Sequence, residues 1–86
     1  MASVEEVKAN IATSVDGTQR AVSTIRQASD QLDEVLGLLR ITAIGSMHPQ
    51  VAATLAQLEQ ARTRLDEAAT LARGAVDSAE AYRSVV

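Results

Sequence analysis

Histidine, aspartate and glutamate are the residue types in this sequence that could carry acid–base or metal chemistry, but their spacing does not gather them. His48 is the only histidine and the chain has no cysteine, so the three or four ligands of a protein zinc site cannot be assembled in one chain. A Ser-His-Asp arrangement needs a histidine beside a serine. His48 instead precedes Pro49, which favours a helix cap over a ligand or a base.

Two pairs of adjacent carboxylates, Asp33-Glu34 and Asp66-Glu67, are the next candidates for chemistry. Helical di-metal proteins combine glutamates with a Glu-x-x-His motif, which this sequence lacks. The four glycines stand singly, so no glycine-rich phosphate loop is present. We therefore predict a protein that is not an enzyme, with no metal, no cofactor and no small-molecule substrate.

The charge distribution argues against nucleic acid and membranes as partners. The net charge is −3, and acidic and basic residues are mixed along the 86 residues. Arg20, Arg26 and Arg40 form at most a weak basic line, without aromatic residues to stack on bases. No apolar run approaches the length of a membrane span, and the acidic N-terminus lacks the features of a cleaved signal peptide. We expect a cytoplasmic protein, or one exported without such a peptide.

The first helix is predicted over residues 4–44. Ser3 and Glu6 have the spacing of a capping box. Apolar residues then recur every seven positions, with a companion row three residues later and a third row that widens the stripe. The Asp16-Gly17 pair weakens this helix locally, but the seven-residue phase runs through it unshifted. The main row is Val4, Ile11, Thr18, Ile25, Leu32 and Leu39, the companion row is Val7, Ser14, Ala21, Ala28 and Val35, and the third row is Val15, Val22 and Leu36.

A turn is predicted at residues 45–49 and a second helix over 50–84. Gly45 can close a helix in the left-handed conformation, Pro49 can open the next one, and His48 becomes its N-cap. Gly37 and Gly74 are expected to mark close helix approach or local flexibility. The second helix repeats the seven-residue pattern, mostly with alanine. Its main row is Val51, Leu58, Leu65, Ala72, Ala79 and Val86, its companion row is Ala61, Ala68, Ala75 and Tyr82, and Leu55, Ala69 and Val76 broaden it.

The fold class that follows is all-α: a single helical hairpin of two long antiparallel helices. One helix pair can bury only the facing stripes, so we expect the third row of the first helix to remain in water. Dimerisation into a four-helix bundle would cover it, and a helical partner protein is the alternative. The residues predicted to form this interface are Ile11, Val15, Val22, Ile25, Leu32, Leu36, Leu39, Ile44, Met47, Val51, Leu55, Leu58 and Leu65.

Apolar residues form a cluster around the turn, namely Leu36, Leu38, Leu39, Ile41, Ile44, Met47, Val51 and Leu55. They are interpreted as the end core of a dimer, with a docking site for one client protein as the alternative. The corresponding functions are a self-associating interaction module and a regulatory adaptor or chaperone.

The two-helix pattern with a glycine-containing turn, in an acidic, alanine-rich chain, resembles the WXG100 (ESAT-6-like) proteins. Alanine and arginine richness with a single lysine is similar to products of actinobacterial genomes. At the motifs, Gly45 stands where the family has Trp-x-Gly, and Tyr82 is followed four residues on by Val86 in place of an acid. The resemblance implies a dimerising helical hairpin, exported by the type VII system and often found beside toxins.

Overall fold

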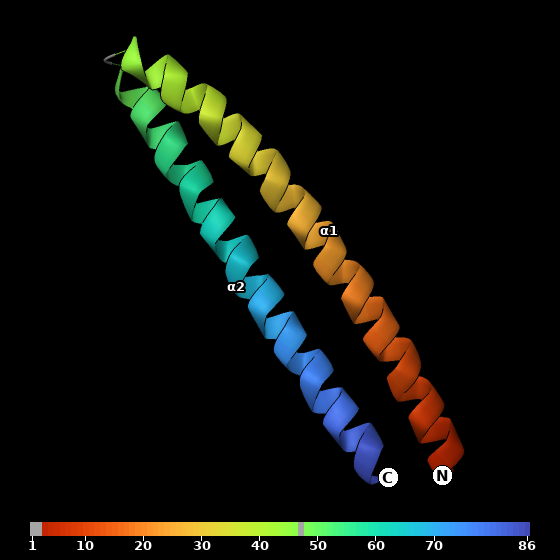
Figure 1. Ribbon diagram of the computed structural model, residues 1–86. Coiled ribbons are helices and arrows are strands. Elements are labelled where there is room, and N and C mark those ends of the chain that lie inside the picture. Colours follow the sequence, from red (N-terminus) through yellow and green to blue (C-terminus); the bar gives the residue numbers. More distant parts are fainter. Residues whose placement is uncertain (1–2, 47) are drawn as a thin grey trace.

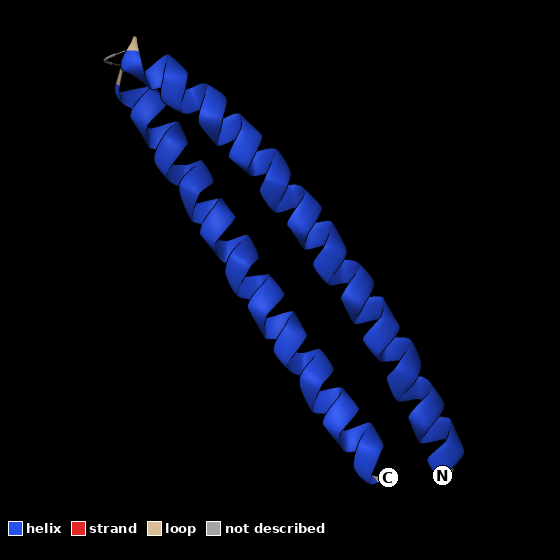
Figure 2. Cartoon of the chain, viewed as in Figure 1, coloured by secondary structure: helices blue, strands red, loops and turns tan. Residues whose placement is uncertain are grey.

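The computed structural model describes residues 3–46 and 48–86, and within them the chain forms two helices and no strand (Figure 2). Helix α1 spans Val4–Ile44 and helix α2 spans Pro49–Val85. The two helices run antiparallel and place both termini at the same end of the molecule, as Figure 1 shows. The predicted helical hairpin is therefore confirmed, with each helix end within one residue of its predicted position.

The N-terminal ends of both helices are capped as the sequence indicates. The backbone N–H of Glu6 donates to Ser3 Oγ at 3.1 Å, and the backbone N–H of Gln50 donates to His48 Nδ1 at 3.0 Å. Each bond satisfies a backbone donor that the first helical turn leaves free. The reciprocal half of the capping box, from the Ser3 N–H to the Glu6 side chain, is not formed among the described residues.

The end of α1 differs from the prediction. Gly45 has φ −94° and ψ 2°, so it does not adopt the left-handed conformation. The N–H of Gly45 donates to the Thr42 carbonyl at 3.1 Å, and that of Ser46 donates to the Ala43 carbonyl at 3.2 Å. Such i to i−3 bonds tighten the last turn and satisfy its carbonyls without a left-handed residue.

Helix α1 is continuous through the predicted weak point. The Asp16-Gly17 pair lies within the helix, and an ion pair of 3.1 Å joins Arg20 to Asp16 across one helical turn. A Cβ placed on Gly17, Gly37 or Gly74 would meet nothing within 4 Å. The expectation that Gly37 and Gly74 mark close helix approach is therefore wrong.

The molecule is long and thin, with extents of 63 × 19 × 15 Å. Its core is a single stripe along each helix, because each helix has only one neighbour. Only five residues of the described chain are buried, namely Val15, Val22, Ser29, Leu36 and Ala69.

Candidate interaction surfaces

The inward face of α1 combines the predicted main row with the third row. Residues of the third row, such as Val22 and Leu36, are buried, whereas Ile25 and Leu32 of the main row are half-buried. The expectation that the third row stays in water is therefore wrong. The companion row lies beside the contact rather than in it, and Val35 within it is exposed. Alternating steps of four and three residues, as in Ile11, Val15, Thr18, Val22, Ile25, Ser29, Leu32, Leu36 and Leu39, describe the observed stripe.

Helix α2 shows the same shift of one position. Its main row is half-buried as predicted from Val51 to Ala79, but the companion row, which includes Ala61 and Ala68, is exposed. The predicted alanine seam therefore does not face α1. The second inward row is Leu55, Arg62, Ala69, Val76 and Arg83.

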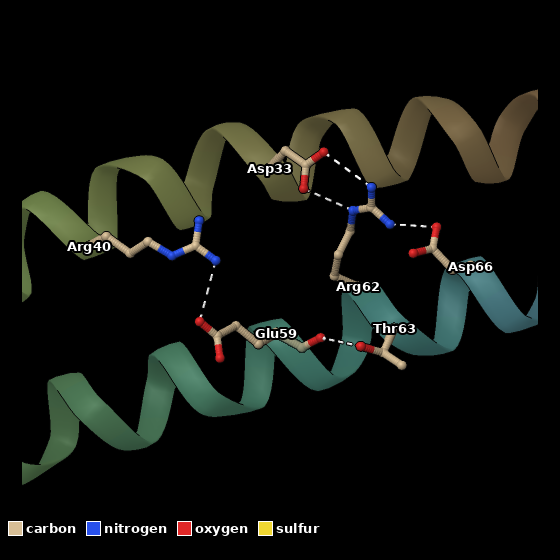
Figure 3. A network of polar contacts seen from close by, with 6 residues as sticks. All are labelled: Asp33, Arg40, Glu59, Arg62, Thr63 and Asp66. Atoms are coloured by element: carbon tan, nitrogen blue, oxygen red, sulfur yellow. Dashed lines mark hydrogen bonds and ion pairs between the residues drawn. The ribbon is translucent and has the colours of Figure 1, made fainter.

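Arg62 of α2 reaches across to Asp33 of α1 and links the two helices (Figure 3). Its Nε donates to Asp33 Oδ1 at 2.8 Å and its Nη2 donates to Asp33 Oδ2 at 3.3 Å. Its Nη1 is paired with the Asp66 carboxylate on its own helix. Glu59 lies three residues before Arg62 but binds Arg40 of α1 instead, with 3.3 Å between Oε1 and Nη2.

These contacts shift the acid–base equilibria of both central partners in the direction of the charged forms. The hydrogen bond from Arg62 lowers the pKa of Asp33 below its usual value of 3.8, and the positive charges of Arg62 and Arg40 act in the same direction. The hydrogen bonds that Arg62 donates to Asp33 and then to Asp66 raise the pKa of Arg62. Both directions describe one ion pair in which the two members stabilise each other's charge.

The side of the hairpin that carries these ion pairs is charged on both helices, and we call it the charged flank. Two shallow grooves of about 400 and 490 Å³ lie on it, and both are lined by Arg26 of α1 and Arg73 of α2. The residues of the charged flank occur at every seventh position of each helix. They are Arg26, Asp33 and Arg40 on α1, and Glu59, Asp66, Arg73 and Glu80 on α2.

The opposite side has no charged residue at the corresponding positions. One residue rotates a helix by about 100°, so Arg40 lies about 40° to one side of Leu36 and Val35 lies about 100° to the other. The Arg40–Glu59 ion pair and the groove lined by Arg26 and Arg73 place the charged rows of both helices on one side of the hairpin. Because the helices are antiparallel, the companion rows of both helices then lie together on the other side. We call this face the uncharged flank: Val7, Ser14, Ala21, Ala28 and Val35 on α1, and Thr54, Ala61, Ala68, Ala75 and Tyr82 on α2.

A third surface lies on α1 near the turn and faces away from α2. Leu38, Ile41 and Ile44 have exposed fractions of 69%, 70% and 89%, and we call these three residues the tip patch. The other described members of the predicted apolar cluster, namely Leu36, Leu39, Val51 and Leu55, line the contact between the helices.

The predicted interface residues fall almost entirely within the hairpin. Ile11, Val15, Val22, Ile25, Leu32, Leu36, Leu39, Val51, Leu55, Leu58 and Leu65 are buried or half-buried on the facing stripes, and Ile44 is exposed. Met47 lies outside the described residues. The pattern missed Arg62 and Ser29 as inward positions, although the step of four residues from Leu58 and Ile25 points to both.

The histidine and carboxylate side chains do not gather into a metal site in the part of the chain that the structure describes. Neither helix there has the length and apolarity of a bilayer span. His48 uses Nδ1 to cap α2. Comparison with protein-family models, curated proteins and solved structures finds no match to this chain.

Proposed function

We propose that this chain is a non-enzymatic protein–protein interaction module that self-associates, with two hairpins forming an antiparallel four-helix bundle. The observation that carries the proposal is the accessible surface of 6264 Å². A compact monomer of 9.1 kDa would expose about 4,900 Å² by the usual scaling with mass. The surplus of about 1,400 Å² exceeds the roughly 800 Å² that each partner buries in a standard interface.

The thin core supports the same proposal. A two-helix hairpin buries one stripe per helix, and the main rows of both helices remain half-buried on that stripe. Small domains without disulfides or metals commonly gain stability by oligomerising. In a four-helix bundle each helix contacts two neighbours, and the half-exposed residues enter a shared core.

Light scattering coupled to size-exclusion chromatography tests the proposal. At micromolar concentration we expect twice the chain mass of 9.1 kDa. Dilution is expected to lower the thermal midpoint, because dissociation is coupled to unfolding. A monomer that unfolds cooperatively at a concentration-independent temperature would reject self-association.

The tip patch favours a second candidate function, an adaptor or chaperone that binds one helical client protein. Its three large apolar residues point into solvent from α1, and hydrophobic anchors of this size are typical of helix-in-groove recognition. Leu38→Glu with Ile41→Glu is the informative variant. The adaptor predicts a lost client with the dimer intact, and loss of the dimer with this variant would assign the patch to self-association.

Export belongs to this proposal as well. A dimerising hairpin is the shape that the resemblance to WXG100 proteins implies, and we propose that the chain acts in the cytoplasm or leaves the cell without a cleaved signal peptide, in a secretion- or toxin-associated setting. Cell fractionation with detection of the intact chain in the culture medium separates the two locations.

A further inference from the structure

The two flanks of the hairpin differ in the charge of their residues. Along the uncharged flank, every seventh position of both helices is alanine, valine, serine, threonine or tyrosine. Along the charged flank, the same register carries the ion pair between Arg40 and Glu59 and the network around Arg62. We propose that the uncharged flank is the face on which a second copy of this chain docks, an inference that rests on the proposed self-association.

Burial within the hairpin supports this choice. The buried row of α1, with Val22 and Leu36, lies beside the charged flank, and Val22 lines one of the grooves there together with Arg26 and Arg73. The half-buried row, with Leu32 and Leu39, lies beside the uncharged flank, where the alanine side chains are too short to cover it. On the flank itself, Val35 and Tyr82 have exposed fractions of 42% and 51%, so this face offers apolar surface that the hairpin leaves open.

The occupant that fits this face is a second copy. An uncharged surface presents no like charges to itself, so two copies related by a two-fold axis would bring no like-charged side chains into contact there. Small side chains such as Ala28 and Ala68 let helix backbones approach closely. A membrane surface would call for basic residues beside the apolar ones, and the flank has none at these positions. The surplus of about 1,400 Å² is a total for the whole hairpin, and a standard interface of roughly 800 Å² on one face would take up a little over half of it.

The other two surfaces fit a second copy less well. Docking through the charged flank would remove Arg26 and Arg73 from water together, at a large desolvation cost. The tip patch offers three residues on one helix end, which is a small share of the area that a stable dimer buries.

A pair of glutamate substitutions on the flank tests the proposal by equilibrium sedimentation. Ala61→Glu with Ala68→Glu introduces charge at two exposed positions, each within one turn of Arg64, so the hairpin itself tolerates it. We expect the dimer dissociation constant to rise roughly 100-fold or more, because the carboxylates would lose water in the interface. The matched control, Ala53→Glu with Ala81→Glu, adds the same charge on the outward side of α2 and should dimerise as the unmodified chain does.

Single cysteines give a second readout that does not depend on a destabilised variant. The chain has no cysteine, so Ala68→Cys and Ala53→Cys each carry one thiol for a maleimide probe. We expect the rate of labelling at residue 68 to fall at least tenfold as concentration rises through the dimer range, with residue 53 unchanged.

The outcomes separate the two proposals. If the Ala61→Glu, Ala68→Glu variant dimerises as the unmodified chain does, the uncharged flank is not the dimer interface, although self-association stands. The same conclusion follows if dimerisation slows maleimide labelling at residue 53 and not at residue 68. If the unmodified chain is a monomer at every concentration, self-association and this inference both fall.

Discussion

Arg62 is a charged residue at a position of α2 that packs toward α1. Its side chain keeps 28% of its surface exposed, so Arg62 is not fully withdrawn from water although it faces the seam. The bidentate hydrogen bonds to Asp33 have a fixed planar geometry. Sliding α2 by one helical turn would break both bonds, so the pair favours one register between two otherwise similar apolar stripes.

The Asp33–Arg62 pair predicts a specific response to acid. Because the folded-state pKa of Asp33 lies below its value in the unfolded chain, the pair stabilises the fold above the unfolded pKa of about 3.9. That stabilisation is lost as the pH falls through the folded-state pKa. We expect Asp33→Asn to be less stable than the unmodified chain at pH 6, with the difference shrinking below pH 4.

Urea unfolding followed by circular dichroism at several pH values measures this effect. Asp30→Asn is the control, since Asp30 lies on the same helix and makes no ion pair among the described residues. A constant difference between Asp33→Asn and the unmodified chain from pH 6 to pH 2 would contradict the proposed linkage.

At the scale of the helices, stability depends on very few large buried side chains. Leu36 has an exposed fraction of 2%, whereas Leu38, two residues away on the same helix, has 69%. We expect Leu36→Ala to lower the free energy of unfolding by about 2–4 kcal/mol, because it removes a buried side chain and leaves a cavity. Leu38→Ala should change it by about 0.5 kcal/mol or less. Equal losses in urea unfolding would show that the helix faces are assigned wrongly.

The helix ends were predictable from the sequence because Ser3, His48 and Pro49 act locally. The inward faces were only half predictable. Steps of three and of four residues from Ile25 both reach small side chains, Ala28 and Ser29, and small residues are tolerated buried or exposed. The ion pairs between the helices favour the row that contains Ser29 as the inward one, because they bring the charged side of each helix together across the hairpin. The sequence did not indicate that Arg62 faces inward, because a charged residue within an apolar stripe is usually exposed.

Gly17 offers a second test at this scale. It lies inside α1, and a Cβ at this position would have open space around it. Gly17→Ala should raise the free energy of unfolding by about 0.5–1 kcal/mol, because alanine loses less backbone entropy in a helix. Thermal unfolding at fixed protein concentration measures it. A loss of stability would mean that residues 16 and 17 do not remain helical in solution.

At the scale of the whole molecule, the hairpin separates two kinds of interaction. Ion pairs on the charged flank, such as that between Arg40 and Glu59, lie within one chain. The uncharged flank carries accessible apolar side chains, such as Val35 and Tyr82. Self-association through that flank would therefore depend on burial of apolar area, while the register between the two helices depends partly on charge.

This separation predicts how salt acts on the dimer. Raising sodium chloride from about 0.1 M to about 1 M shortens the Debye length from about 10 Å to about 3 Å. The net charge of −3 on each chain makes two copies repel weakly, and salt screens that repulsion, while apolar burial does not weaken. We expect the dissociation constant from sedimentation to stay within about threefold or to fall. Arg40→Gln should leave it unchanged, since Arg40 is satisfied by Glu59 of its own chain. A tenfold rise with salt would mean that ion pairs between chains hold the dimer, and that the second copy docks on the charged flank instead.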